Sequence, residues 1–233
     1  MLKVVGFYTD DPLYSEHAKL FKASLERFGI EPYLQKYSQD EWQNIIALKP
    51  SFIKGVMDEF DCPVLYVDVD AFVHEDITPF FSAIEEDVAF HLFKGEELLS
   101  GTLFFNNSER AKQLINYWLK EQSEHPDDWD QKTLQRAVER MKKDAGLSIY
   151  LLGEEYTQIF DSSTKEGKTV IEHLQASRDR RFEKVINRKN VVERFFKLIP
   201  IFNVSYRKIL KRRKYVEELA NSVGLTLKFE SFR

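Results

Sequence analysis

The stretch Val64-Leu65-Tyr66-Val67-Asp68-Val69-Asp70 is the part of the sequence that decides the fold. Its first four residues are apolar and prone to β structure, which is typical of a strand buried on both faces of a sheet. Residues two apart on an extended chain point the same way, so Asp68 and Asp70 are expected to face one spot. That spot lies at the carboxyl end of the strand, where ligands bind in open α/β sheets. Two carboxylates there suit a divalent cation and, with it, a phosphate group; an acidic, solvated turn is the alternative.

The segments on either side of this strand alternate between strand-like and helix-like patterns. Strands are expected over residues 3–8, 32–37, 88–92, 101–105, 148–152 and 169–172. Helices are expected over residues 13–28, 50–60, 111–119 and 134–141, where apolar residues recur at helical spacing. The second of these helices is expected to open at Pro50. This order predicts an α/β fold with a parallel sheet flanked by helices.

Length and composition are those of a packed globular protein. The chain has 233 residues, 43% of them hydrophobic and 14% aromatic, which is enough for a full α/β core. No apolar run approaches the roughly 20 residues needed to span a membrane, and the strand pattern that begins at Lys3 leaves no room for a signal peptide. The single cysteine, Cys62, excludes an internal disulfide and fits a reducing compartment. We therefore expect a cytoplasmic protein.

Charge is distributed unevenly along the chain. Residues 178–214 carry 14 lysines and arginines against three acidic residues, whereas residues 1–177 carry 18 against 32. This asymmetry predicts an acidic domain over residues 1–179 and a basic, mainly helical extension over residues 180–233.

Basic and apolar residues interleave in this extension at helical spacing. Such a helix suits an anionic membrane surface, which we expect residues 180–214 to contact, placing the protein in the cytoplasm or on the inner face of a membrane. The alternative is that the apolar face packs on the acidic domain while the charges are solvated. Nucleic acid is not expected as a partner, because the acidic domain would oppose its binding.

Four more motifs follow Asp68-Val69-Asp70 in order along the chain. They are Ser100-Gly101-Thr102-Leu103-Phe104-Phe105-Asn106, a helix containing Trp118, Asp130-Gln131, and Glu172-His173-Leu174-Gln175-Ala176-Ser177-Arg178. The ordered set resembles the nucleotide-diphospho-sugar transferases that have the GT-A glycosyltransferase fold, over about residues 1–180. The resemblance implies a Rossmann-like α/β fold of GT-A type with a mixed, mainly parallel sheet, in which residues 1–179 form a nucleotide-sugar-binding catalytic domain.

This resemblance implies a glycosyltransferase that moves a sugar from a UDP- or GDP-linked donor to a glycan, lipid-linked or protein acceptor. It also implies a metal cofactor, Mn²⁺ or Mg²⁺, held by Asp68, Asp70 and His173. A cation that bridges both phosphates stabilises the charge that builds on the leaving nucleoside diphosphate, and imidazole together with carboxylates is acceptable to Mn²⁺. A hydrogen-bonded structural histidine is the alternative for His173.

The resemblance also assigns residues to the donor. Tyr8 and Thr9 end the first strand, where related enzymes hold the base and the ribose, although core packing is the alternative for Tyr8. Asp68 is shared between the metal and the ribose. The remaining implied donor contacts are Lys49 and Arg178 near the phosphates, and Ser100 and Gly101 near the sugar. Most lysines and arginines are simply solvated, which is the alternative for these two cations.

Asp130 and Gln131 are the catalytic candidates. They resemble the acidic and amide pair that lies beside the anomeric carbon of the donor in related transferases. Asp130 is suited to bind sugar hydroxyls or to act as a base on the acceptor. The alternative for Asp130 is an N-cap, since it stands just ahead of a predicted helix.

Two other functions fit part of the sequence. The run ending in Asp68-Val69-Asp70 also resembles the first motif of haloacid-dehalogenase-like phosphatases, with Asp68 as nucleophile and Asp70 as acid/base. Against this, Ala71-Phe72 stands where that motif has Gly-Thr or a similar hydroxyl residue, and about sixty residues precede the strand. A convincing later lysine and Asp-Asp pair is also missing from the sequence. The second alternative is a transferase-like domain that binds a nucleotide sugar without turnover.

Overall fold

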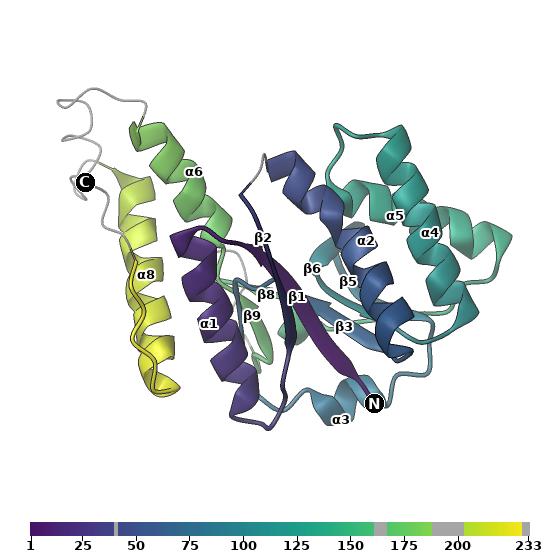
Figure 1. Cartoon of the computed structure of the whole chain (residues 1–233), viewed down its shortest axis with the longest axis horizontal. Coiled ribbons are helices and arrows are strands. Elements are labelled where there is room, and N and C mark those ends of the chain that lie inside the picture. Colours follow the sequence, from purple (N-terminus) through teal and green to yellow (C-terminus); the bar gives the residue numbers. More distant parts are fainter. Residues whose placement is uncertain (40–41, 161–166, 188–202, 230–233) are drawn as a thin grey trace.

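The computed structural model describes residues 1–39, 42–160, 167–187 and 203–229 (Figure 1). The strands are β1 (Lys3–Thr9), β2 (Tyr33–Tyr37), β3 (Val64–Val67), β4 (Ala71–Val73), β5 (Val88–Phe93), β6 (Glu97–Phe105), β7 (Ile149–Leu151), β8 (Gln158–Ile159) and β9 (Ile171–His173). The helices are α1 (Pro12–Glu26), α2 (Trp42–Phe60), α3 (Thr78–Ser82), α4 (Glu109–Glu124), α5 (Asp130–Asp144), α6 (Ala176–Asn187) and α8 (Val204–Ser222), with a 3₁₀ turn η1 (Glu154–Tyr156). All the predicted strands and helices are present, although several begin or end at other residues.

Six of the described strands form one sheet, in the order β2-β1-β3-β6-β5-β7. The pairs β1–β2, β1–β3 and β5–β7 are parallel, whereas β6 is antiparallel to both of its neighbours, β3 and β5. The predicted α/β fold with a mixed, mainly parallel sheet is therefore confirmed.

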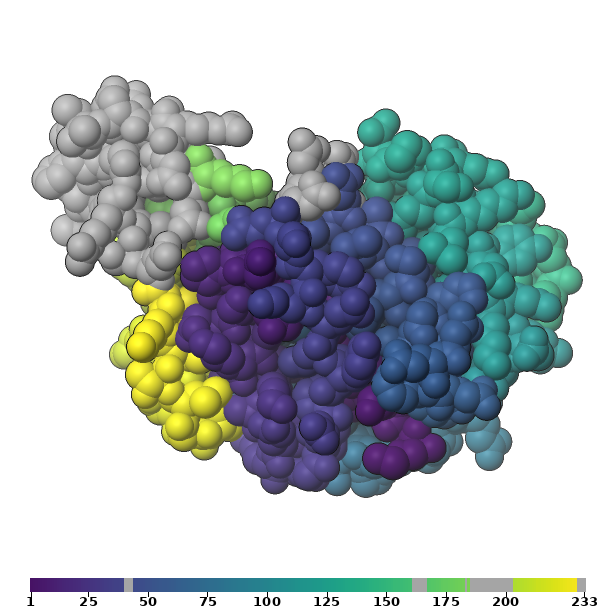
Figure 2. All heavy atoms as spheres, in the orientation of Figure 1, coloured from purple at the N-terminus to yellow at the C-terminus, as the bar shows by residue number. Residues whose placement is uncertain are grey.

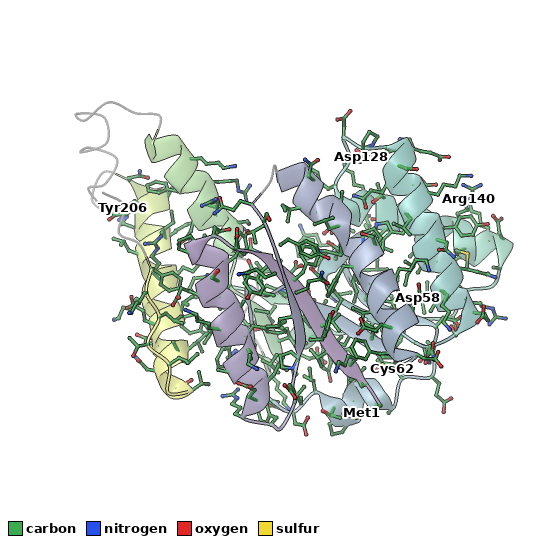
Figure 3. All side chains as sticks on the ribbon, in the orientation of Figure 1. Met1, Asp58, Cys62, Asp128, Arg140 and Tyr206 are labelled. Carbon is green, nitrogen blue, oxygen red and sulfur yellow. The ribbon has the colours of Figure 1, made fainter. Side chains whose placement is uncertain are left out.

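Strand β3 separates two hydrophobic cores. Val64 and Tyr66 belong to the core under α2, α4 and α5, whereas Leu65 and Val67 belong to the core under α1 and α3. Figure 3 shows side chains filling the space between the sheet and the helices on both sides. All four residues are buried, so burial on both faces explains the continuous apolar run. Asp68 directly follows this buried strand.

The sequence pattern does not predict a second, smaller sheet. Three more of the described strands form it in the order β4-β9-β8, with β4 antiparallel and β8 parallel to β9. Strand β4 has only three residues, which is too short to show a periodicity. In the β4–β9 register Ala71 pairs with His173. Because Asp70 immediately precedes Ala71, this pairing brings Asp70 and His173 together.

Helix α2 begins at Trp42, so the prediction that it opens at Pro50 is wrong. Proline lacks a backbone N–H, and its ring clashes with the carbonyl four residues earlier, which costs about 3 kcal/mol inside a helix. The turns ahead of Pro50 offset this cost, because Ile45 and Leu48 pack against the core and Lys49 is buried in ion pairs. As a result, a helix and not a loop carries Lys49.

The predicted basic extension contains the helix α8 and most of α6, and its residues 188–202 lie outside the described part of the chain. The predicted boundary after residue 179 falls inside α6. Helix α8 packs against α1, where Val216, Leu219 and Ala220 share a core with Leu20; Figure 2 shows the yellow α8 against the purple α1. The apolar face of α8 therefore lies on the acidic domain. None of the described helices has both the length and the apolar character needed to cross a bilayer.

His17, on α1, is buried beneath the last described residues. Its ring lies 5.6 Å from the ring of Phe229, and its Nδ1 atom has no hydrogen-bond partner among the described residues. Burial, and then the charges of Arg212 and Arg213, lower the pKa of His17 to about 3 from its usual 6.5. His17 is therefore neutral in the folded protein at pH values where an unfolded chain binds a proton there.

We expect the free energy of unfolding to fall as the pH is lowered below 6.5, because only the unfolded chain then binds a proton at His17. The part of the free energy of unfolding that depends on neutral His17 is fully present above the usual pKa. Below that pKa it decreases by about 1.4 kcal/mol per pH unit. In urea unfolding at about pH 7.5 and about pH 5, His17→Gln should reduce the pH dependence by about 2 kcal/mol. The control His125→Gln, at an exposed histidine, should leave it nearly unchanged. Equal effects of the two variants would contradict this expectation.

Candidate active site

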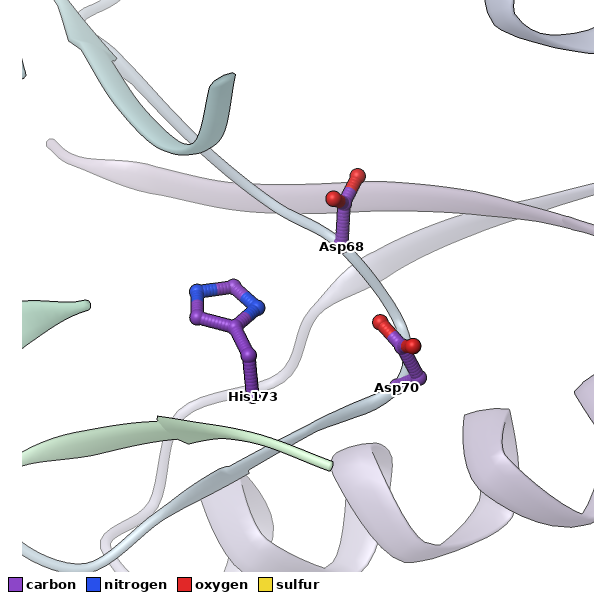
Figure 4. Close-up of side chains that lie close together, drawn as sticks. All are labelled: Asp68, Asp70 and His173. Carbon is purple, nitrogen blue, oxygen red and sulfur yellow. The ribbon is translucent and has the colours of Figure 1, made fainter. Parts of the chain in front are cut away.

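Three side chains that can hold a metal ion converge at the carboxyl end of β3. Asp68 directly follows β3, Asp70 directly precedes β4, and His173 is the last residue of β9. One ligand atom from each lies within 4.8 Å of the others (Figure 4). Two ligands of one cation lie at most about 4.2 Å apart at metal–oxygen distances of about 2.1 Å, so these side chains need only small movements to share an ion. Two carboxylates and an imidazole are a donor set that fits Mn²⁺.

Gly101 leaves the room that two of these ligands need. A Cβ atom at this position would lie 2.9 Å from Cε1 of His173 and 3.3 Å from Oδ2 of Asp68. Gly101 is held in place by the Asp68 N–H group, which donates to its carbonyl oxygen at 2.9 Å. A side chain there would therefore push His173 away from the carboxylates. The geometry of the site therefore requires glycine at position 101.

Each of the three side chains is oriented by a hydrogen bond. The Tyr66 hydroxyl donates to Asp68 Oδ1 at 2.7 Å, and the backbone N–H of Ala176 donates to Asp70 Oδ2 at 2.8 Å. Nε2 of His173 lies 2.9 Å from Oγ1 of Thr102. Because Nε2 is engaged with Thr102, the ring nitrogen that faces the two carboxylates in Figure 4 is Nδ1. Such outer hydrogen bonds fix the orientation of metal ligands.

The electrostatics of the three residues suit a cation. Burial, and then the neighbouring charge of Asp68, raise the pKa of Asp70 to about 6, although the Ala176 N–H group opposes this shift. Two partly exposed carboxylates held close together repel each other, and a cation between them relieves that repulsion. Burial lowers the pKa of His173, which favours the neutral imidazole that a metal requires.

Lys49 connects Asp68 with Asp130. Its Nζ atom lies 2.7 Å from Asp130 Oδ2 and 3.2 Å from Asp68 Oδ1, and it donates to the Ser100 carbonyl oxygen at 3.1 Å. The side chain is buried. Burial alone would lower the pKa of Lys49, but the charges of Asp130 and then Asp68 outweigh it and raise that pKa. Lys49 therefore stays protonated and holds the two carboxylates in place.

Asp130, Gln131 and Ser100 lie together beside this lysine. The Ser100 hydroxyl donates to Asp130 Oδ2 at 3.0 Å, and the Ser100 N–H donates to Gln131 Oε1 at 3.4 Å. Asp130 is the first residue of α5, and Trp129 occupies the N-cap position, so the N-cap alternative for Asp130 is wrong. The carboxylate of Asp130 is instead turned toward Lys49, in contact with the residues around the three potential metal ligands.

The remaining predicted donor residues lie on two other elements. Tyr8 is half-buried in β1 and packs against the core under α1, and the Thr9 hydroxyl donates to Asp11 at 2.5 Å. None of the hydrogen bonds described above joins Tyr8 or Thr9 to the carboxylates of Asp68, Asp70 or Asp130. Arg178 lies in the first turn of α6, two residues after Ala176.

Sequence reasoning assigned no role in the site to Tyr66, Thr102 or Tyr14. Tyr66 precedes Asp68 by two residues on an extended chain, so strand alternation already places both side chains on one face. Thr102 belongs to the same motif as Ser100 and Gly101, but nothing in the sequence indicates that its hydroxyl contacts His173. Burial, and then the charge of Asp70, raise the pKa of Tyr14 on α1; this electrostatic interaction has no signal in the sequence.

Comparisons with known proteins agree with this architecture. A family model described as nucleotide-diphospho-sugar transferase matches residues 17–182. A glycosyltransferase involved in the glycosylation of the major capsid of PBCV-1 is similar in structure, with a TM-score of 0.61 and 16% identity over 78% of this chain and 98% of that chain. The apo form of the glycosyltransferase GlyE from Streptococcus pneumoniae TIGR4 has a TM-score of 0.50 and 19% identity, covering 74% of this chain and 54% of that chain. A search of curated proteins finds no match. The structural similarities confirm the predicted GT-A type fold.

Proposed function

We propose that this chain, which belongs to the nucleotide-diphospho-sugar transferase family, transfers a sugar from a UDP- or GDP-linked donor to a glycan, lipid-linked or protein acceptor with the help of Mn²⁺ or Mg²⁺. One observation carries the metal-dependent part of the proposal. Asp68 and Asp70, together with His173 from a distant part of the sequence, offer ligand atoms within 4.8 Å of one another at the carboxyl end of a central strand.

In the proposed reaction the bond between the anomeric carbon and the diphosphate oxygen of the donor breaks, and an acceptor hydroxyl oxygen bonds to that carbon and loses its proton. The products are the glycosylated acceptor, the nucleoside diphosphate and a proton. A cation held by Asp68, Asp70 and His173 would supply Lewis-acid stabilisation of the leaving diphosphate. Lys49 keeps Asp68 and Asp130 in fixed relative positions. These pairings orient the groups before the donor arrives, so little reorganisation is needed during the reaction.

We assign Asp130 and Gln131 to the sugar of the donor. Asp130 is buried and paired with Lys49 at 2.7 Å. A carboxylate in such a pair remains a good hydrogen-bond acceptor, which suits the binding of sugar hydroxyls. We assign Gln131 to act with Asp130, which is supported by their shared contacts with Ser100.

Asp70→Asn should abolish metal-dependent binding of UDP or GDP and reduce transfer by about 100-fold or more, because it removes one of the two charges that attract the cation. The check is a thermal-shift and calorimetric titration of UDP and GDP with and without Mn²⁺, followed by a transfer assay with nucleotide-sugar donors. The matched control is Asp58→Asn, which alters an exposed aspartate on α2 that pairs with Lys54 and should change neither result.

The same experiment separates the alternatives. Retained Mn²⁺-dependent nucleotide binding in Asp70→Asn would contradict the metal site. Binding without turnover in the unaltered protein would identify an inactive nucleotide-sugar-binding domain. Hydrolysis of a generic aryl phosphate would favour the phosphatase, an alternative that loses its basis once the chain belongs to a transferase family.

The acceptor, the cytoplasmic location and the membrane surface facing residues 180–214 remain predictions. Arg212 and Arg213, which belong to this segment, pair with Asp179 at 2.6 Å and 3.0 Å. These two charges are therefore directed into the protein, and contact with anionic lipid would depend on the other basic residues of the segment.

A further inference from the structure

Helix α8 lies outside residues 17–182, which match the transferase family, yet it contacts residues on both sides of His173. In Figure 1, α8 runs beside α6 and α1 at one end of the molecule. The contacts come from three neighbouring residues of α8, namely Arg212, Arg213 and Tyr215. They reach the end of β9 and the start of α6.

The first contact holds the end of β9. The Tyr215 hydroxyl donates to Glu172 Oε2 at 2.7 Å, and Nε2 of His74 lies 3.1 Å from the same oxygen. The Tyr215 ring also stacks on Phe160, with 5.0 Å between the ring centroids. Glu172 is buried and immediately precedes His173. A fixed Glu172 side chain therefore limits the movement of the strand that carries His173.

The second contact holds the start of α6. Arg212 Nη1 and Arg213 Nε donate to the two carboxylate oxygens of Asp179, at 2.6 Å and 3.0 Å. Asp179 and Arg212 are both buried. Hydrogen bonds between charged groups out of water are strong and well oriented. Asp179 lies three residues after Ala176, in the first turn of α6.

Between these two contacts lies a turn, residues 173–176, that builds part of the site. Leu174 donates its N–H to the Asp70 carbonyl oxygen at 2.6 Å, and Ala176 donates its N–H to Asp70 Oδ2 at 2.8 Å. Gln175 has a φ of 60°, a left-handed backbone that residues other than glycine rarely adopt. Such a conformation persists only when the surrounding structure imposes it. The turn is held from both ends.

We infer that α8 clamps the turn 173–176, so that Tyr215, Arg212 and Arg213 are positioning residues for Asp70 and His173. The clamp deepens the proposed function, because it explains how a helix outside the family-matched region contributes to the metal site. The effect of the clamp on the backbone of residues 173–176 can be measured without metal or donor.

The direct test is amide hydrogen exchange of the full-length protein, followed by NMR, in Tyr215→Phe. This variant keeps the ring that stacks on Phe160 and removes only the hydroxyl bonded to Glu172. The Leu174 and Ala176 amides should exchange about tenfold faster, because local opening of the turn becomes easier. The Asp68 amide, bonded to Gly101 in the large sheet, should stay within about twofold of its original rate.

The matched control is Tyr117→Phe on α4, whose ring lies under Arg140; it should leave all three amides unchanged. Asp179→Asn, which weakens the other contact, should accelerate the same two amides as Tyr215→Phe. Unchanged exchange of Leu174 and Ala176 in both variants overturns the inference. Equal acceleration of Asp68 also overturns it, because α8 would then stabilise the whole fold without a local effect on the turn.

A titration with Mn²⁺ alone links the clamp to the site. Tyr215→Phe and Asp179→Asn should each weaken Mn²⁺ binding by about three- to tenfold, less than the loss of a group bonded directly to a ligand. If the variants speed exchange at Leu174 and Ala176 but the unaltered protein binds no Mn²⁺, the clamp is supported and the metal site is contradicted. Normal exchange with normal Mn²⁺ binding in both variants supports the metal site and overturns the clamp.

Discussion

Gly101→Ala is expected to abolish Mn²⁺-dependent nucleotide binding and sugar transfer while leaving the protein folded. The added methyl group would lie 2.9 Å from His173 Cε1 and 3.3 Å from Asp68 Oδ2. The first distance is too short for a carbon–carbon contact, so the imidazole must move. A displacement of about 1 Å in a catalytic constellation costs about 100-fold in rate. We therefore expect transfer to fall by at least about 100-fold.

Gly55→Ala is the matched control for Gly101→Ala. Gly55 lies within α2, and a Cβ atom there would meet nothing within 4 Å apart from its chain neighbours and the backbone of its own helix. Alanine in a helix is favoured over glycine by about 1 kcal/mol, so this variant should be slightly more stable and fully active. The measurements are a Mn²⁺ titration, a transfer assay and thermal unfolding. Gly101→Ala with normal Mn²⁺ binding would show that the glycine has no role in spacing the ligands.

Lys49→Met is expected to reduce the free energy of unfolding by about 3 kcal/mol, because the loss of one partner leaves buried charge without compensation. Lys49 is 4% exposed and lies between the carboxylates of Asp130 and Asp68. Without the lysine these two acids repel each other in a site that is partly out of water. Methionine has a similar length and keeps the apolar part of the side chain.

Lys54→Met on the same helix is the control for Lys49→Met. Lys54 pairs with Asp58 at 2.7 Å, and both side chains are well exposed, at 40% and 56%. Exposed pairs of this kind contribute about 0.5 kcal/mol or less. Urea unfolding at neutral pH measures both variants. If both variants lost a similar, small amount of the free energy of unfolding, Lys49 would have no special role in holding Asp68 and Asp130 together.

The large sheet and the two aspartates of the site, Asp68 and Asp70, could be predicted from the sequence. The apolar run of β3 indicates a strand buried on both faces, and the alternation of a strand places Asp68 and Asp70 on one side of its end. Local patterns of this kind extend over a few residues, so they are visible in a single sequence. His173 became a candidate only through its position in an ordered set of motifs, because a lone histidine carries no such pattern.

The rest of the site depends on contacts that no local pattern encodes. The ion pairs of Lys49 require α2 to continue through Pro50, which local propensity opposes and tertiary packing permits. The role of Gly101 depends on the approach of His173 from a different strand. The contact between Tyr215 and Glu172 likewise joins segments that are far apart in sequence. Each of these follows from the three-dimensional structure alone.

The pairing of β4 with β9 has a consequence for the order in which the two sheets form. All six strands of the large sheet end by Leu151, whereas His173 meets Ala71 only after β9 has been added. Contacts between distant segments form late, since the long loop between them must first be closed. During synthesis all strands of the main sheet are therefore made before His173, the proposed third metal ligand. The proposed metal centre can form only after β9 has joined β4, so we expect metal binding to report that this late pairing is complete.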